Sequence, residues 1–498
     1  MSKQGFSVVF RRLTAIGCLA ILGLAMSKAR AQDVPPPLPV DPNAYPSAPA
    51  PAQSDPNAEV LTRGPVHEAY AAPLSSGQTT GVIVPRQPAN PIEEVPPDMK
   101  PDAANATWIP GYWSYDDERR DFVWVSGVWR VPPFGNRWMP GYWQEAPGQG
   151  YQRVSGYWMP VQAQDTTYLP QPPQSVEAGP TSPAPGTNQF WVSGHWQWRG
   201  DRYVWQPGYW TSYQSDWIFV PPTYAWTPRG WVYVPGYWDY PLARRGLVFS
   251  PVYFARPVPY YQPAICVDAG VFGVSLFCRP TYGHYYYGDY YDDHYVEFGI
   301  HPWFYYNSPR VGFDPLFGYY RWYHVDHMGE REWGVHLVGW HDYYRMHPDM
   351  RPPRTWAAQE RLLASPEGRM RPDIAQLRLV GDVHVVARLP GASVRLAVVS
   401  PGERAHLQAA ARESAHFEAE RREVERSAAG GGARGAQKVS LASMPSYKAA
   451  TASATAAAGR PAGAAATAGA PARGPATART AAAKSNSRER EKKPQGEK

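Results

Sequence analysis

Clustered histidines and aspartates are the residues of this sequence that could most readily do chemistry. They form two sets, His324/Asp326/His327 and Asp289/Asp292/Asp293/His294. Imidazole and carboxylate groups at short spacing can bind zinc or another divalent transition metal. The spacings match no established metal motif, and H-E-x-x-H does not occur. We therefore expect these residues to be structural, with a metal-dependent hydrolase as a distant alternative.

Signatures of other enzyme classes are absent from the sequence. It contains no G-x-S-x-G elbow, no Gly-rich phosphate loop, no dinucleotide fingerprint and no Cys/His pair typical of a nucleophilic enzyme. The sequence therefore predicts a non-enzymatic protein without a cofactor.

The first 31 residues have the pattern of a secretory signal peptide. Basic residues precede an apolar run from Leu13 to Met26, and Ala29-Arg30-Ala31 is an A-x-A cleavage site before Gln32. As a helix the run is about 21 Å long, which is short of the roughly 30 Å hydrocarbon core, so cleavage is favoured over a membrane anchor. We expect export to the periplasm, cell envelope or extracellular space, with no membrane-spanning segment after cleavage.

Two cysteines, Cys266 and Cys278, remain after this cleavage. In an oxidising compartment an even pair favours one disulfide that closes a short loop. Two free, buried thiols are the alternative.

The basic charge of the chain lies mainly in its tail. The formal net charge is +6, but Arg434 to Lys498 alone carries twelve Lys/Arg and three Glu. A solvated low-complexity tail is the simplest interpretation, and we expect no specific nucleic-acid partner.

The strongest pattern is an internal repeat, W-x-x-G-x-W, with a period of 14 to 16 residues. Sixteen of the 21 tryptophans lie between Trp108 and Trp238. In chain order, the nine units are Trp108/Gly111/Trp113, Trp124/Gly127/Trp129, Trp138/Gly141/Trp143, Arg153/Gly156/Trp158, Trp191/Gly194/Trp196, Trp205/Gly208/Trp210, Phe219–Tyr224, Tyr233/Gly236/Trp238 and Phe249–Phe254. Units 4 and 8 lack the first indole, and units 7 and 9 keep only the overall pattern.

Alternating residues and turn-rich connectors predict one unit per strand of an antiparallel meander. A two-residue turn at Gly200-Asp201 places five residue pairs opposite one another: Arg199/Arg202, Trp198/Tyr203, Trp196/Trp205, Ser193/Gly208 and Trp191/Trp210. In an antiparallel pair, the first position of one unit lies opposite the sixth position of the other, so any two antiparallel units can pair Trp with Trp. Because these positions are five residues apart, an unbroken strand sends its two indoles to opposite faces.

Proline at the third position of many units raises an alternative geometry. Proline removes a ladder donor and is poorly tolerated in central strands. A Pro-Gly pair also fits the centre of a type II turn, which would bend each unit back on itself. We favour strands with a kink or bulge at this point, because the strongest turn residues lie between the units.

Three segments resemble the YXWGXW (WxxGxW) repeat family of exported bacterial proteins: 108–113, 123–129 and 138–143. The segment that precedes the first repeat, Pro96-Pro97-Asp98-Met99-Lys100-Pro101, is similar to that family too. The resemblance covers about 95–345. It implies export and a repeat architecture. It implies no activity and no catalytic residues.

Differences in composition, mainly in proline, glycine and alanine, divide the chain into regions. The expected regions are a signal peptide (1–31), a disordered Pro-rich spacer (32–104), repeat block 1 (105–160), a Pro-rich linker (161–188), repeat block 2 (189–256), a Tyr/His-rich β region (257–350), a small α/β region ending in a helix (351–429) and a disordered basic tail (430–498). The fold class is therefore mostly β, with long disordered segments and a C-terminal helix that begins at the capping box Ser400-Pro401-Gly402-Glu403.

The expected function is a structural or interaction role in the cell envelope, with envelope polysaccharide or envelope proteins as possible partners. The alternative is a glycan-binding module, because Trp and Tyr faces stack on sugars. Exposure of the tryptophans separates the two: buried rings indicate a core, and a solvent-facing row indicates a binding surface.

Overall fold

The computed structural model describes residues 57–71, 80–306, 314–371, 373, 377–386, 395–427 and 435–441. All of them belong to the first of two compact units, Met1–Pro461. The expected signal peptide, with its cleavage site at Ala31 and Gln32, lies outside the described residues. No helix within the described part of the chain has the length and apolar character needed to cross a bilayer.

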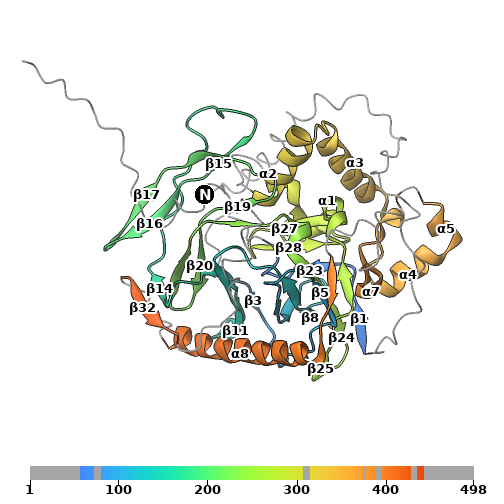
Figure 1. The fold of residues 1–498 in the computed structure, drawn as a ribbon, viewed down its shortest axis with the longest axis horizontal. Coiled ribbons are helices and arrows are strands. Elements are labelled where there is room, and N and C mark those ends of the chain that lie inside the picture. Colours follow the sequence, from blue (N-terminus) through green and yellow to red (C-terminus); the bar gives the residue numbers. More distant parts are fainter. Residues whose placement is uncertain are drawn as a thin grey trace, which may run out of the picture. The chain divides into compact units, whose positions relative to one another are not determined.

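The first eight repeat units pair two by two into four antiparallel hairpins, seen in green and blue in Figure 1. Hairpin 1 (107–130) contains β6 Thr107–Ile109, β7 Tyr112–Asp116, β8 Asp121–Val125 and β9 Val128–Arg130. Hairpin 2 (136–160) contains β10 Asn136–Met139, β11 Tyr142–Ala146, β12 Gly150–Val154 and β13 Tyr157–Pro160. Hairpin 3 (189–212) contains β15 Gln189–Val192, β16 His195–Arg199, β17 Arg202–Gln206 and β18 Tyr209–Ser212. Hairpin 4 (218–239) contains β19 Ile218–Val220, β20 Thr223–Thr227, β21 Gly230–Val234 and β22 Tyr237–Asp239.

The predicted register of hairpin 3 is confirmed. Trp196 lies opposite Trp205, and Trp191 lies opposite Trp210. Arg199/Arg202 and Trp198/Tyr203 pair as expected, whereas Ser193 and Gly208 lie in the break between strands. Hairpin 1 has the same register, with Trp108 opposite Trp129 and Trp113 opposite Trp124.

Each unit is a strand interrupted at its third and fourth positions. In all eight units one strand ends at the second position and the next begins at the fifth, as at Ile109 and Tyr112. A proline at the third position therefore removes no ladder hydrogen bond, which resolves its conflict with a strand. The type II turn does not occur, because the glycines of these units are not among those with positive φ and because positions one and six pair with another unit.

The nine units do not run through one continuous meander. Unit 9 supplies β24 Val252–Phe254, which pairs with β8 of hairpin 1, and β23 Gly246–Val248, just before unit 9, pairs with β9. A strand from repeat block 2 therefore completes the sheets of block 1. β1 Ala58–Val60 then pairs with β24.

The spacers expected to lack structure contain short strands, so this expectation is wrong where those strands lie. They contain β1, β2 Gly64–Pro65, β3 Ile83–Val84, β4 Glu93–Glu94, β5 Met99–Pro101 and β14 Asp165–Leu169. Their few apolar side chains, such as Val66, Tyr70 and Ile92, are buried in the core. In the expected tail, β32 Gln437–Ser440 pairs with β14. The spacers are ordered because the hairpins provide apolar surface for them.

The Tyr/His-rich region was expected to be β, but it is mixed. It begins with β25 Tyr260–Tyr261, β26 Ile265–Val267, α1 Phe272–Ser275, β27 Leu276–Arg279, β28 His284–Tyr287 and β29 His301–Pro302. It ends with α2 Pro315–Arg321, a π-helix Trp322–His327 and α3 Trp333–Met346. Asp314 caps α2 by accepting from the backbone N–H groups of Leu316 and Phe317. α3 buries Leu337, Trp340, His341 and Tyr344, which lie on one side of a helix. Short 3-10 turns connect these elements at Leu242–Arg244, Ala269–Val271, Asp293–Val296, Trp303–Tyr306 and Pro348–Met350.

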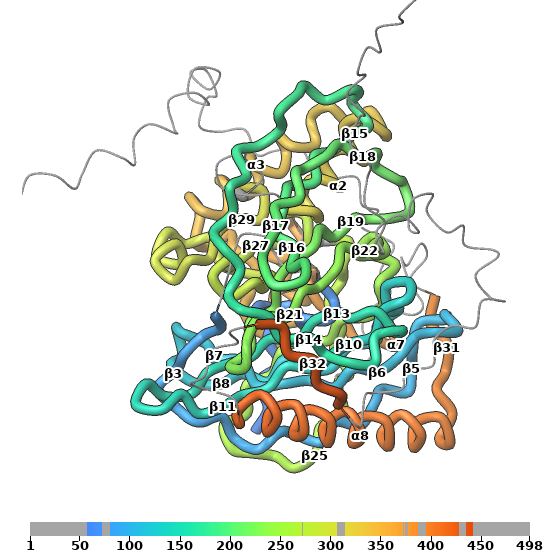
Figure 2. Tube along the Cα trace, turned by 90° about the vertical axis from the view of Figure 1, so that its left-hand side faces the viewer, coloured from blue at the N-terminus to red at the C-terminus, as the bar shows by residue number. Residues whose placement is uncertain are grey.

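The C-terminal part matches the expected small α/β region. It contains α4 Trp356–Ala364, α5 Pro366–Arg369, β30 Val380–Asp382, α7 Val383–Val386, β31 Leu396–Val398 and α8 Pro401–Arg426. Ser400 caps α8 by accepting from the Glu403 backbone N–H, as the capping box predicts. Figures 1 and 2 show α8 lying alongside β11.

A buried ion pair anchors α8 to hairpin 2. Arg421 and Glu425 are fully buried and pair with each other at 2.8 Å. The guanidinium of Arg421 also donates to the Pro140 carbonyl at 2.7 Å, and Glu425 accepts from the hydroxyls of Tyr142 and Tyr168. The narrow apolar side of this helix is therefore supplemented by a charged pair whose partners lie on hairpin 2 and on β14.

Cys266 and Cys278 are free thiols, so the expected disulfide is not formed. Cys266 lies on β26 and Cys278 on β27, in different sheets and different core clusters. Both are buried, and burial raises the pKa of both thiols. The alternative of two buried thiols is the one that the structure matches.

Candidate functional site

Facing indoles of paired units meet edge to face. Ring centroids lie 5.3 Å apart in Trp108/Trp129, 5.1 Å in Trp113/Trp124, 5.2 Å in Trp138/Trp158, 5.5 Å in Trp191/Trp210 and 5.3 Å in Trp196/Trp205. In hairpin 4, Phe219 takes one indole's place against Trp238 at 5.1 Å. Aromatic pairs prefer this geometry and contribute about 0.5–1.5 kcal/mol each beyond the area they bury.

The two indole pairs of a hairpin enter different parts of the core. Trp113 and Trp124 belong to one buried cluster, and Trp108 and Trp129 belong to another. In hairpin 2, Trp138 and Trp158 lie in the largest cluster, whereas Trp143 packs against the cluster of Trp113. The two indole pairs of a block 1 hairpin therefore pack in separate parts of the core.

The repeat glycine receives the first-position side chain of the partner unit. A Cβ at Gly127 would lie 2.4 Å from Trp108, and one at Gly111 would lie 2.8 Å from Trp124. The same reciprocal contact joins Gly194 to Trp205 and Gly208 to Trp191. It recurs for Gly156 with Trp138, Gly141 with Arg153 and Gly236 with Phe219. The tryptophan and the glycine of the motif thus form one interlocking contact, which explains why they recur together.

Hairpin 3 differs from hairpin 1 in its exposure. The four repeat tryptophans of hairpin 1 are between 0% and 7% exposed. Those of hairpin 3 (Trp191, Trp196, Trp205 and Trp210) are all half-buried, and Tyr209 is 45% exposed. Among the described strands, none pairs with hairpin 3 from outside, whereas β23 and β24 cover hairpin 1. Hairpin 3 therefore presents aromatic side chains to solvent.

The strand pair β16 and β17 of hairpin 3 has an aromatic face and a polar face. By strand alternation Trp196, Trp198, Tyr203 and Trp205 lie on one face. The opposite face carries Gln197, Arg199 and Gln206, and the Arg199 guanidinium donates to both glutamine side chains at 3.1–3.2 Å. Trp198 donates its indole N–H to the Gly200 carbonyl at 3.1 Å. Stacking surface and hydrogen-bonding groups thus lie within one small hairpin.

An extended segment before each block places a carboxylate at the repeat glycine. We call Asn90–Glu94 leader 1 and Gln174–Glu177 leader 2. Glu94 accepts from the backbone N–H groups of Gly111 at 2.8 Å and Gly127 at 3.0 Å, and from the Trp124 indole N–H at 2.7 Å. Glu177 accepts from the backbone N–H groups of Gly194 and Gly179. Both glutamates lie 17 residues before the glycine that opens their block.

Each leader also accepts a hydrogen bond from an indole. The Asn90 carbonyl accepts from Trp113 at 3.0 Å, and the Gln174 carbonyl accepts from Trp196 at 2.9 Å. The two leaders differ in burial. Glu94 is only 4% exposed and burial raises its pKa to about 7, whereas Val176 beside Glu177 is 59% exposed.

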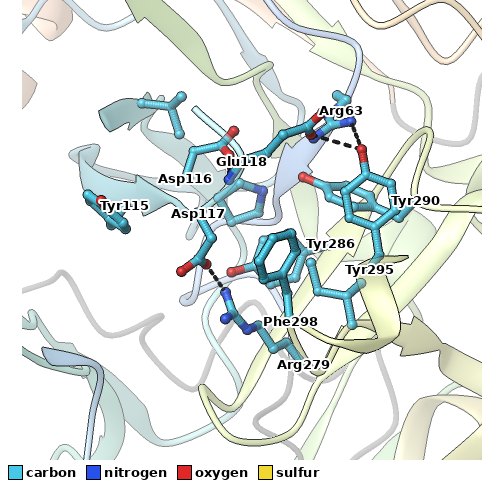
Figure 3. A pocket seen from close by; sticks show the side chains of 13 residues that line it. Arg63, Tyr115, Asp116, Asp117, Glu118, Arg279, Tyr286, Tyr290, Tyr295 and Phe298 are labelled. Atoms are coloured by element: carbon cyan, nitrogen blue, oxygen red, sulfur yellow. Dashed lines mark hydrogen bonds and ion pairs between the residues drawn. The ribbon is translucent and has the colours of Figure 1, made fainter. Parts of the chain in front are cut away.

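A pocket lies where the turn of hairpin 1 meets the Tyr-rich region (Figure 3). It encloses about 340 Å³, part of it open to solvent. Arg63 pairs with Glu118 and donates to Tyr295 at 2.6 Å, while Arg279 pairs with Asp117. The Arg63 guanidinium lies 4.5 Å from the ring centre of Tyr290. The charged groups of this pocket bind each other and connect two regions of the fold. We therefore assign the pocket a structural role.

The histidines and aspartates singled out for metal chemistry mostly contact other residues, although Asp292 and His294 pair with each other. His324 contacts Glu330 at 2.7 Å and stacks on Trp333, whereas His327 stacks on Trp322. Asp289 binds Arg354 at 2.7 Å, and Asp292 binds His294 at 2.7 Å. Asp293 lies 3.7 Å from Arg345. Within the described ranges, no three His, Cys, Asp or Glu side chains are arranged to hold a metal ion.

Sequence reasoning identified the aromatic residues of the site and missed the leaders. The matching distance of 17 residues from Glu94 to Gly111 and from Glu177 to Gly194 was readable in the sequence, and it was the available indication. Arg421 and Glu425 were also missed, because their partners outside α8 lie more than 250 residues away.

Comparison with known proteins finds the repeat alone. No curated protein and no solved structure matches this chain. A family model described as "WXXGXW repeat (2 copies)" matches 107–130, 186–211 and 215–238, which are hairpins 1, 3 and 4. Hairpin 2, in which Arg153 replaces a tryptophan, is not among the matched segments. The resemblance seen in the sequence is therefore confirmed: these three segments carry the WXXGXW repeat, two copies to a hairpin.

Proposed function

We propose that this is an exported, non-enzymatic interaction protein of the cell envelope. In this proposal block 1 and the Tyr-rich region form the scaffold, and hairpin 3 is the binding surface. The supporting observation is that one motif in one register is buried in hairpin 1 and half-buried in hairpin 3. Rings that served only as a core would gain stability from burial in both hairpins.

A glycan is the ligand class that best fits hairpin 3. Sugars present apolar C–H faces that stack on aromatic rings, and their hydroxyls need donors and acceptors close by. Trp198, Tyr203 and Tyr209 supply rings for stacking, whereas the polar side chains Gln197 and Gln206 lie on the opposite face of the same hairpin and accept from Arg199. Export, inferred from residues 1–31, would place this surface beside envelope polysaccharide.

A purely architectural role is the second candidate. It is favoured by the many contacts that the hairpins make with distant parts of the chain, such as α8 on hairpin 2. In that case the exposed rings of hairpin 3 would have no ligand of their own.

Retention on immobilised envelope polysaccharide separates the two candidates. We expect saturable retention of the mature chain, and at least a tenfold loss of affinity in the Trp198→Ala/Tyr209→Ala double variant. Tyr260→Ala is the matched control, because Tyr260 is 64% exposed and lies outside the repeats. Absence of saturable retention, or equal loss in the control, would favour the architectural role.

A further inference from the structure

The two leaders make the same pair of contacts with their hairpins, although their sequences differ. In each, a backbone carbonyl binds the sixth-position indole of the first unit, and a glutamate binds the N–H of that unit's glycine. The carbonyl comes from Asn90 or Gln174, and the carboxylate follows it by four or three residues. A hairpin of this repeat therefore has a defined seat for an extended segment that carries one carboxylate.

The interrupted strand creates this seat. At the third and fourth positions the chain leaves the ladder, so the glycine N–H is free to bind another group. The lack of a side chain gives access: a Cβ on Gly127 would lie 2.5 Å from a carboxylate oxygen of Glu94. Backbone N–H groups and an indole N–H are donors only, so the seat selects a group that accepts hydrogen bonds.

Leader 1 is fixed in its seat by the rest of the fold. β4, which includes Glu94, pairs in parallel with β25, and Ile92 is 5% exposed within the core. The neighbouring Glu93 pairs with Arg412 of α8. This occupant cannot leave without disrupting hairpin 1.

Leader 2 is more exposed than leader 1. Gln174, Ser175, Val176 and Ala178 are exposed, and among the described strands none pairs with this segment. The connection that follows, 181–185, is exposed as well. Loss of leader 2 from its seat would therefore cost little of the fold's buried surface.

We propose that hairpin 3 is a recognition site for an extended, proline-flanked peptide segment of a partner protein that presents one glutamate, and that leader 2 occupies this site in cis. The partner's carboxylate would bind the Gly194 N–H in place of Glu177. A backbone carbonyl of the partner would accept from the Trp196 indole in place of that of Gln174. This proposal is independent of glycan binding, because it rests on Gly194 and Trp196 and not on Trp198 or Tyr209.

The test uses a fluorescein-labelled peptide with the sequence of residues 170–180 and the full mature chain. The wild-type chain should bind it weakly, because the tethered leader competes at an effective concentration in the millimolar range. The Glu177→Ala chain, whose own leader lacks the carboxylate, should bind at least tenfold more tightly by fluorescence anisotropy. A peptide with glutamine in place of its glutamate should bind this variant at least tenfold more weakly.

Two controls keep the result interpretable. Glu145→Ala removes an exposed glutamate of hairpin 2 and should bind the peptide as weakly as the wild type. Glu177→Gln is a milder change and should give an intermediate gain if the alanine variant proves unstable. Equal binding of the two peptides, or no gain in either Glu177 variant, would overturn the proposal.

Discussion

Hairpin 1 and hairpin 3 share a motif, a register and a leader carboxylate, but they differ in what lies against them. Unit 9, leader 1 and α8 surround hairpin 1, and its tryptophans are almost fully buried. Hairpin 3 keeps its indole pairs at the same spacing without such cover. The motif thus specifies the pairing of two strands, and the surrounding chain decides whether the pair becomes core or surface.

Unit 9 shows how cover is supplied to hairpin 1. Phe249 packs against Trp108 at 5.8 Å between ring centres, and Phe254 packs against Trp113 at 6.5 Å. Its first and sixth positions therefore reach both faces of the hairpin, although it lies more than 100 residues further along the chain. Hairpin 3 has no such third strand among the described residues.

The largest expected effect is from removing one indole in each hairpin. Trp124→Ala, at 1% exposure, should cost about 3–5 kcal/mol of unfolding free energy, because it leaves a large cavity in the core. Trp205→Ala should cost about 1–2 kcal/mol, since its half-exposed ring loses less buried area. Urea unfolding of both variants measures the difference. Equal losses would contradict the division into core and surface.

The pairing within hairpins could be read from the sequence because it is local. The Gly200-Asp201 turn fixes the register, and the repeat spacing carries it to the neighbouring unit. The break at positions three and four follows from Pro-Gly and Ser-Gly in the same way. Both depend on residues within a single hairpin.

Contacts over long distances in the sequence could not be predicted. The partner of unit 9 is hairpin 1, and the partners of Arg421 are Pro140 and Tyr142, none of which a local pattern indicates. The helices α2 and α3 were missed because their Tyr, Phe and Trp content is typical of strands. The fate of Cys266 and Cys278 depended on which sheets their strands joined.

A second difference between the hairpins should appear in the pH dependence of stability. Burial raises the pKa of Glu94 to about 7, above the usual value of 4.5. The folded state therefore holds this proton more tightly than the unfolded state. The contribution of protonated Glu94 to the free energy of unfolding is complete below about pH 4.5 and is lost as the pH rises through 7. The loss amounts to about 3 kcal/mol.

Urea unfolding between pH 5 and 8 tests this expectation. Glu94→Gln should flatten the slope of unfolding free energy against pH. Glu177→Gln should keep the wild-type slope, because it leaves Glu94 in place. A Glu94→Gln variant with an unchanged slope would show that the buried carboxylate of leader 1 does not control the stability of hairpin 1.

The smallest expected difference concerns the glycines that receive an indole. A Cβ at Gly127 would lie 2.4 Å from Trp108, and one at Gly208 would lie 2.4 Å from Trp191, so the contact with the indole is equally close, although Gly127 also faces Glu94. Trp108 is 3% exposed and cannot move, whereas Trp191 is half-buried and has more room to shift. Gly127→Ala should therefore cost about 2–3 kcal/mol and Gly208→Ala about 1 kcal/mol. Because both substitutions add the same methyl group at the same motif position, a larger cost at Gly208 would mean that the indoles of hairpin 3 are held rigidly despite their exposure.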